Sequence, residues 1–327
     1  MTRWKLDSTK LVAAIFLCWM SLAFGGETNW GKWGPDDQIG TLNYITPETI
    51  RQALSLVRKG EVYHLALPVE PGQPTGTARD GRIYRYMIST GQASGDAPGF
   101  ATDQLFTPVH GPTHWDGLAH IYGEGKMYNG FDARMEITSR GASKNGVHHT
   151  STKVVTRGVL VDIARYKGVK YLAGDHIVTP QDIEGAALKQ GVSFRQGDVV
   201  LIRTGWMDVW REKGKDAFWR SGSPGIGWGV SQWLKEIKAA AVGVDTLNVE
   251  IMPCEPEAAQ KIGQPQWGMP IHYELIRNQG MMSGDLFYLD EIAAACAKDG
   301  VYEFLFVGQP LNIINATGSP VSPLAIK

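Results

Sequence analysis

Apolar runs that alternate with helix signals constrain this fold most strongly. The runs lie at 158–163, 198–203, 241–244 and 302–307, and helical patterns occupy 179–189, 232–240 and 289–298. Short apolar runs of this kind are typical of strands buried on both faces, and the intervening helices would cover them. The pattern therefore predicts an α/β fold with one domain over residues 27–327.

Turn and cap residues add detail in the rest of the chain. Thr46 followed by Pro47 predicts a helix N-terminus, with the helix continuing to Val57, and Thr179 followed by Pro180 predicts another. A strand is expected at 62–67 and a short helix at 275–278. Residues 69–103 are rich in Gly, Pro, Thr and Asp, and we expect a long loop there, of the kind that often lines a site.

The first 26 residues resemble an export signal. Arg3, Lys5 and Lys10 precede an apolar run at 11–24, and small residues follow it. The run is shorter than the roughly 20 residues that span a bilayer, so we expect cleavage, a periplasmic or secreted protein, and no stable membrane insertion after processing. An uncleaved N-terminal anchor is the alternative. The net charge of -1 gives no reason to expect a nucleic-acid partner.

The residues that carry chemistry are concentrated in one segment. Three of the chain's 8 histidines, His110, His114 and His120, fall within 11 residues, together with Asp116. Gly111 and Pro112 disfavour a helix here, and in an extended segment the four side chains would project from one face. Imidazole and carboxylate are common ligands of zinc and similar metals, and three of them leave positions open for water and substrate. The segment predicts a catalytic metal site.

This segment resembles the signature HxGTHxDxPxH of the cyclase-like metal hydrolases, which include bacterial kynurenine formamidases and isatin hydrolases. Further similar blocks lie at 37–43, 198–206, 243–247, 270–275 and 302–323, so the resemblance extends from Trp30 to the C-terminus. It implies a swivelling-domain α/β fold with a curved, mixed, partly barrel-like sheet flanked by helices. It also implies a homodimer or a higher homo-oligomer.

The resemblance assigns roles to individual residues. His110, His114 and Asp116 correspond to the metal ligands, His120 corresponds to the proton-transfer histidine, and His272 corresponds to a histidine of the dinuclear members. Those members carry a glutamate 12 positions after that histidine, where this chain has Gly284. We therefore predict one divalent ion, Mn²⁺ or Zn²⁺. Asp285 is a candidate substitute for that glutamate, although its offset by one residue favours a side chain that points away.

Two further residues are candidates for roles in or beside the site. Glu250 shares strand parity with Asn248 and could orient a ligand or bind substrate, although a solvated or capping carboxylate is an equal alternative. Trp115, together with Trp30, Trp33 and Trp206, could line an aromatic pocket, although such tryptophans are commonly core residues. An aromatic small-molecule substrate is the expectation that follows from the pocket.

These features together predict a metal-dependent amidohydrolase that acts on non-peptide C–N bonds. It would open a cyclic amide or imide, or cleave an N-formyl amide, with metal-activated water. One alternative is a lactone hydrolase or a cyclase-dehydratase with the same metal site. The other is an exported, non-catalytic protein that binds metal or ligand.

Overall fold

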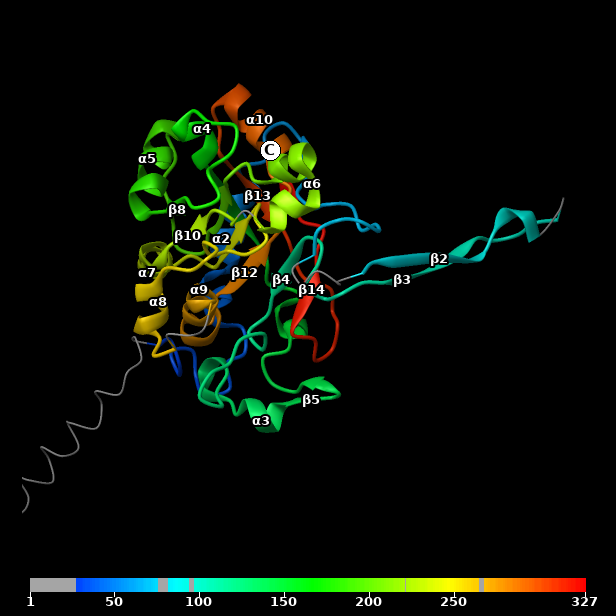
Figure 1. Ribbon diagram of the computed structural model, residues 1–327, viewed down its shortest axis with the longest axis horizontal. Coiled ribbons are helices and arrows are strands. Elements are labelled where there is room, and N and C mark those ends of the chain that lie inside the picture. The colour runs from blue at the N-terminus through cyan, green and yellow to red at the C-terminus, as the bar shows by residue number, and fades with distance from the viewer. Residues whose placement is uncertain (1–27, 76–81, 94–96, 221, 265–267) are drawn as a thin grey trace, which may run out of the picture.

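The computed structural model describes residues 28–75, 82–93, 97–220, 222–264 and 268–327 (Figure 1). The expected export signal at 1–26 lies outside these ranges. Within them, every helix is too short or too polar to cross a membrane. Cys254 and Cys296 are not joined by a disulfide.

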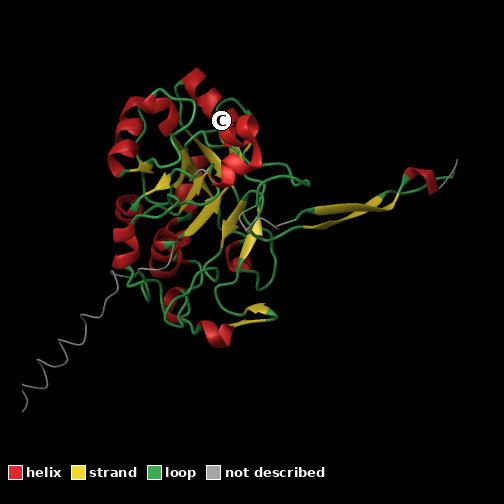
Figure 2. Ribbon diagram, in the orientation of Figure 1, coloured by secondary structure: helices red, strands yellow, loops and turns green. Residues whose placement is uncertain are grey.

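A sheet of nine strands forms the centre of the molecule and curls into an open half-barrel (Figure 2). Its order is β1 (Val62–His64), β15 (Leu324–Ile326), β13 (Glu303–Val307), β7 (Val155–Asp162), β9 (Val199–Arg203), β11 (Ala241–Val244), β12 (Met282–Asp285), β4 (His114–Asp116) and β14 (Gly318–Pro320). Strands β7, β9, β11 and β12 are parallel, and the strands on both flanks are antiparallel. The expected curved, mixed and partly barrel-like sheet is therefore confirmed.

Both faces of this sheet are apolar, as the continuous apolar runs predicted. In β9, Leu201 packs in one buried cluster with Phe304, and Val200 packs in a second cluster with Val242. Helices cover both clusters (Figure 2). The α-helices are α2 (Pro47–Leu54), α3 (Ala133–Glu136), α4 (Ile163–Lys167), α5 (Pro180–Gln190), α6 (Met207–Arg220), α7 (Trp228–Glu236), α8 (Pro256–Lys261), α9 (Pro270–His272) and α10 (Asp290–Asp299).

Local signals located the capped helices correctly. Helices α2 and α5 begin after Thr46 and Thr179, and each threonine forms a capping box with the third helical residue. The expected helix at 275–278 lies within a π-helix, Tyr273–Gln279.

The expectation of a structureless loop at 69–103 is wrong. This region contains β2 (Tyr84–Ser89) and the start of β3 (Thr102–Phe106), which pair as an antiparallel hairpin. Two further small sheets join β5 (Ile137–Thr138) to β6 (Gly141–Ala142) and β8 (Ile177–Val178) to β10 (Gly225–Ile226). The 3-10 helices are η1 (Gly40–Tyr44), η2 (Gly91–Ala93), η3 (Tyr128–Gly130) and η4 (Val147–Thr150).

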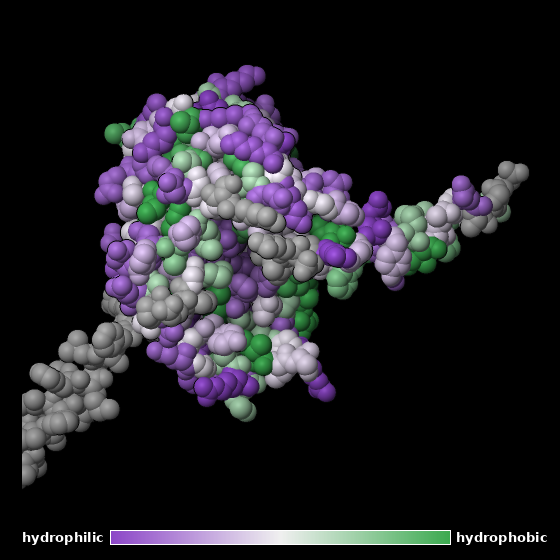
Figure 3. Space-filling view, in the orientation of Figure 1, coloured by the Kyte–Doolittle hydropathy of each residue, from purple (hydrophilic) through white to green (hydrophobic). Residues whose placement is uncertain are grey.

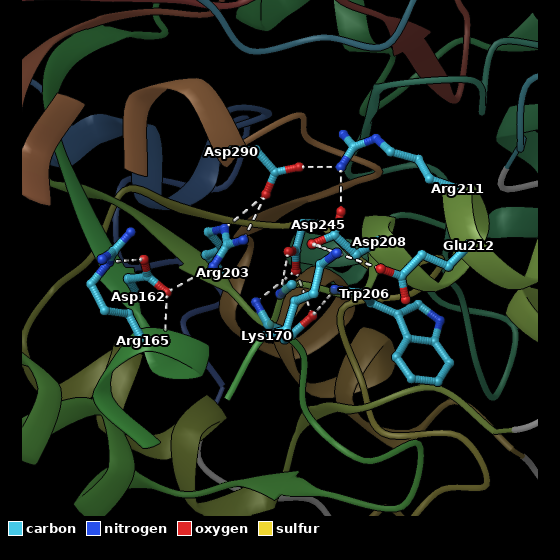
Figure 4. Close-up of polar contacts among 12 residues, drawn as sticks. Asp162, Arg165, Lys170, Arg203, Trp206, Asp208, Arg211, Glu212, Asp245 and Asp290 are labelled. Carbon is cyan, nitrogen blue, oxygen red and sulfur yellow. Dashed lines mark hydrogen bonds and ion pairs between the residues drawn. The ribbon is translucent and has the colours of Figure 1, made fainter. Parts of the chain in front are cut away.

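A buried polar network joins the ends of the central strands (Figure 4). The Arg203 guanidinium at the end of β9 contacts Asp162 of β7 at 3.1 Å and Asp290 of α10 at 2.8 Å. Asp245, just after β11, accepts hydrogen bonds from the backbone N–H of Thr204 at 2.8 Å and from its hydroxyl at 2.6 Å. Burial raises the pKa of Asp245 to about 6. The network fixes the strand ends relative to each other.

Candidate metal centre

The pairing of β4 with β12 places four polar side chains together. Asp116 lies opposite Ser283, and His114 lies opposite Asp285. Directly opposed residues of antiparallel strands project from the same face, so all four side chains share one face. They are almost completely buried.

Two further histidines reach the same point from turns on either side of β4. The Nε2 atoms of His110 and His114 each lie 3.5 Å from Asp116 Oδ1, and His120 Nε2 lies 4.0 Å from it. The segment is not continuously extended, as the parity argument assumed, because the chain turns where the His120 N–H donates to the Gly117 carbonyl. The residues converge as expected, but turns bring them together.

His272 completes the cluster from α9. Its Nε2 lies 3.3 Å from the second carboxylate oxygen of Asp116, which also accepts a hydrogen bond from the Ser283 hydroxyl at 3.4 Å. Asp116 therefore lies at the centre of four imidazole rings, with three of them near one oxygen and the fourth near the other.

These separations suit a metal ion. Nitrogen and oxygen ligands about 2.1 Å from a tetrahedral ion lie about 3.4 Å from one another. Two overlapping groups of potential ligands occur among the described residues, His110 with Asp116 and His120, and His114 with Asp116 and Asp285. The predicted set of His110, His114 and Asp116 spans both groups, and Asp116 is common to them.

The remaining nitrogens of two rings are held by hydrogen bonds. His114 Nδ1 donates to the Pro112 carbonyl at 2.9 Å, and His272 Nδ1 is hydrogen-bonded to Glu250 Oε1. In a neutral ring this leaves Nε2 as the ligand atom, and metal-binding histidines are usually oriented in this way. Glu250 thus orients His272, one of the two roles considered from sequence, and it also accepts the backbone N–H groups of Ile271 and His272 at 3.2 Å.

Three buried polar atoms of the cluster have no hydrogen-bond partner among the described residues. They are His110 Nε2, Asp116 Oδ1 and Asp285 Oδ1. Most buried polar atoms in proteins are paired, because an unpaired one costs about 1–3 kcal/mol. Three such atoms in one cluster fit a site that binds a cation.

The electrostatics of the cluster also fit metal binding. Burial lowers the pKa of His110 to about 3, and it lowers the pKa of His114 and His120. These rings are therefore neutral at pH 7, which is the form that coordinates a metal. Burial alone would raise the pKa of Asp116, but His120 and the hydrogen bond from His272 hold it well below its usual range.

The two other buried groups of the cluster have raised pKa values. Burial and the charge of Asp116 raise the pKa of Asp285 well above its usual range. Burial opposes the charge of His272, but hydrogen bonds with Asp116 and Glu250 raise its pKa well above 6.5. A cation bound beside Asp285 and His272 would compete with proton binding to these two groups.

The interpretation of Gly284 as a lost ligand position is wrong. Gly284 lies opposite Trp115, so it faces the core, and a Cβ there would lie 2.6 Å from the Trp115 ring. Of the two alternatives for Asp285, the structure shows the one in which its side chain faces the site, with Oδ2 3.8 Å from His114 Nε2. The one-residue offset could not decide between them, because it takes no account of strand register. One metal ion per site stays a prediction, but the absence of a side chain at Gly284 no longer supports it.

Of the two alternatives for Trp115, a pocket residue or a core residue, the structure shows the second. Its ring is fully buried on the core side of β4, packs against Phe287 and Phe306, and donates its N–H to the Gly308 carbonyl at 2.6 Å. Alternation along β4 explains this, because the neighbours His114 and Asp116 face the site.

The sequence matches the model of the Cyclase family, described as "Putative cyclase", over residues 44–251. The chain belongs to this family. No protein with curated information matches the sequence. The matched region includes His110, His114, Asp116, His120 and Glu250. His272 and Asp285 lie beyond it.

Solved structures agree with the family assignment. A crystal structure described as a novel cyclase has 36% sequence identity and a TM-score of 0.83, and the match covers 92% of this chain and 98% of the other. Isatin hydrolase A from Labrenzia aggregata has 20% identity and a TM-score of 0.61, with 84% and 98% covered. A predicted metal-dependent hydrolase from Bacillus stearothermophilus has 19% identity and a TM-score of 0.51, with 81% and 97% covered. The last two similarities concern the fold.

Proposed function

We propose that this Cyclase-family protein is a metal-dependent amidohydrolase that opens a cyclic amide or imide, or cleaves an N-formyl amide. The observation that carries the proposal is the accessibility of one histidine in an otherwise buried cluster. The His120 side chain is 28% exposed, whereas those of His114, Asp116 and His272 are at most 2% exposed. A substrate can therefore reach His120, whose Nε2 lies 4.0 Å from the buried Asp116 Oδ1.

The residues have distinct roles in this proposal. His110, His114 and Asp116 would hold one divalent ion, Mn²⁺ or Zn²⁺, and Asp285 offers a further carboxylate. A divalent ion in such a site lowers the pKa of water and polarises a carbonyl group. His120 is neutral at pH 7 because burial lowers its pKa, so its Nε2 can accept a proton from water and pass it to the leaving nitrogen.

Glu250 and His272 position Asp116. The Glu250 carboxylate holds Nδ1 of His272, and Nε2 of His272 contacts the Asp116 oxygen that is remote from His110 and His120. This arrangement directs the other oxygen of Asp116 toward those two rings. An aromatic substrate was expected from a pocket of four tryptophans. Two of these, Trp115 and Trp206, are buried and so do not support that expectation.

The test combines elemental analysis of purified protein with turnover of cyclic amides, N-formyl amides and lactones. We expect about one equivalent of Mn or Zn and products heavier than the substrate by one water. His114→Ala should lose metal and turnover together, and His120→Asn should keep metal but lose turnover. His64→Asn, at an exposed histidine outside the cluster, is the matched control.

Other outcomes would replace the proposal. Loss of one water from an open-chain substrate would indicate a cyclase-dehydratase, and selective lactone opening would indicate a lactone hydrolase. Folded protein that was offered metal and showed neither metal nor turnover would indicate a non-catalytic binding protein. The proposed export, to the periplasm or outside the cell, is tested by N-terminal sequencing of the purified protein, which should begin near residue 27.

A further inference from the structure

One buried arginine lies against the segment that follows His120. Figure 3 shows hydrophilic residues spread over the visible face of the body, where charged side chains are hydrated. Arg277, on the π-helix Tyr273–Gln279, is instead only 6% exposed. A buried charge is destabilising unless polar groups surround it, so the contacts of Arg277 indicate what its side chain does.

The Arg277 guanidinium joins the two ends of one turn. Its Nε donates to the carbonyl oxygens of Gly123 at 3.3 Å and Lys126 at 3.2 Å. Its Nη2 donates to a carboxylate oxygen of Glu124 within the turn at 3.4 Å, and its Nη1 donates to Asn278 Oδ1 at 2.8 Å. Arg277 therefore holds the turn 123–126 on the π-helix.

Two aromatic rings fix the guanidinium in turn. Its central carbon lies 4.8 Å from the centroid of the Trp30 ring and 4.7 Å from that of the Tyr273 ring. The faces of aromatic rings attract a cation, most strongly where water is excluded. Trp30 Nε1 also donates to the Arg277 carbonyl at 2.7 Å. We call Arg277, Trp30 and Tyr273 the arginine clamp.

The turn itself is tight and lies directly against the clamp. Gly123 and Lys126 pair as an isolated antiparallel bridge, and the two residues between them, Glu124 and Gly125, have φ angles of 54° and 75°. Two central residues with positive φ are typical of a two-residue hairpin turn. A Cβ at Gly123 would lie 2.3 Å from the Tyr273 ring, so the backbone approaches that ring as closely as glycine allows.

His120 depends on its backbone for its position. Hydrogen bonds hold Nδ1 of His114 and of His272. Neither ring nitrogen of His120 has such a partner among the described residues, and its Nε2 lies 4.0 Å from Asp116 Oδ1. The position of the His120 ring therefore follows from the backbone on each side of it.

That backbone is anchored on both sides. The His120 N–H donates to the Gly117 carbonyl at 2.9 Å. After His120, Ile121 is 5% exposed and packs in the same buried cluster as Tyr273, and the turn 123–126 begins two residues later. The second anchor of His120 is therefore the turn that Arg277 holds.

We propose that Arg277 is a positioning residue for the reaction, a role that rests on the function proposed above. The arginine clamp fixes the turn 123–126, and the turn fixes the backbone from which the His120 ring projects. A displacement of about 1 Å at a reacting group can lower turnover about 100-fold. Loss of Arg277 is therefore expected to lower kcat, and to leave KM and the metal content nearly unchanged.

Hydrogen exchange of the purified full chain tests the clamp without relying on any reaction. Arg277→Leu removes the guanidinium, and Arg157→Leu, at a buried arginine paired with Asp198 and Glu303, is the matched control. Exchange of residues 121–127 is expressed relative to that of β11 in the same sample. We expect this ratio to rise at least about 10-fold in Arg277→Leu, because local opening no longer breaks hydrogen bonds to a charged group, and to stay unchanged in the control.

Steady-state kinetics on a substrate that the wild type hydrolyses test the positioning role. We expect kcat per folded molecule to fall about 100-fold in Arg277→Leu, with KM and metal content close to wild type. Arg157→Leu should leave all three unchanged. Arg277→Lys keeps the charge without the planar guanidinium, so it should regain part of the exchange protection and part of kcat together. The lysine variant also serves if the leucine variant does not fold.

The outcomes separate this proposal from the proposed function. Exchange at 121–127 that rises no more than in the control would overturn the clamp. Faster exchange with a wild-type kcat would overturn the positioning role, as would an equal loss of kcat in Arg157→Leu. A wild type that turns over none of the compounds would overturn the proposed function and, with it, the role of Arg277 in catalysis, whereas faster exchange would still show that Arg277 holds the turn.

Discussion

Neighbouring positions 284 and 285 should respond to mutation in opposite ways. A Cβ at Gly284 would lie 2.5 Å from the Phe287 ring and 2.6 Å from the Trp115 ring, and both rings are completely buried. Trp115 is further fixed by its hydrogen bond to Gly308. Overpacking a core costs about 1–3 kcal/mol, and two fixed rings place Gly284→Ala near the upper end. The metal content of this variant should not change, since position 284 faces the core.

Asp285→Asn should show the reverse. Burial and the charge of Asp116 raise the pKa of Asp285, which favours its protonated form, and an amide closely resembles a protonated carboxyl group in shape. The free energy of unfolding of the metal-free protein should therefore change by less than about 1 kcal/mol, a usual limit for a volume-conserving change. Metal retention should fall at least about 10-fold, because the amide offers no negative ligand.

The assay is urea unfolding of metal-free protein, followed by tryptophan fluorescence, with elemental analysis after dialysis against metal. Gly284→Ala that unfolds within about 0.5 kcal/mol of wild type would show that the glycine does not face the core. Asp285→Asn that retains metal as well as wild type would remove Asp285 from the site. Either result would refute the strand register from which both expectations are drawn.

Three other predictions concern the same region and the core. Gly318→Ala should weaken metal retention measured by competition with a chelator, because its Cβ would lie 2.5 Å from His110 Nε2 and displace that ring. Metal-free protein should lose stability as pH falls from 6.5 toward 3, with His110 contributing about 1.4 kcal/mol per pH unit, since the unfolded ring binds its proton at the higher pH. His110→Asn should flatten this slope in urea titrations, and an unchanged slope would contradict the lowered pKa of His110. Arg157→Leu should cost about 3–5 kcal/mol in thermal or urea unfolding, because it leaves Asp198 buried without the guanidinium that contacts it at 2.7 Å.

The sequence predicted the helix starts and strands that depend on local signals. The capped starts of α2 and α5 follow from Thr-Pro pairs, and strands β7, β9, β11 and β13 follow from uninterrupted apolar runs. The density of histidines around Asp116 located the candidate site without any knowledge of its geometry.

What the sequence did not predict depends on pairing between distant segments. Strand β4 has three residues, too few for a recognisable alternation, and its partners β12 and β14 come from far along the chain. Without that register, the sequence could not decide whether Asp285 faces the site or whether Trp115 belongs to a pocket or to the core. The hairpin at 84–106 was read as a loop because much of its surroundings is turn-forming.

The position of β4 in the sheet has a consequence for biosynthesis. The strand that carries His114 and Asp116 is hydrogen-bonded to β12 on one side and to β14, which ends at Pro320, on the other. Contacts between residues so far apart in sequence form only after the chain between them has been made and closed into a loop. A ribosome-bound fragment that lacks β14 therefore lacks one of the two strands that pair with β4. A chain released early, or one shortened by ten residues at its C-terminus, would have all the ligand side chains discussed and still lack a strand that holds them.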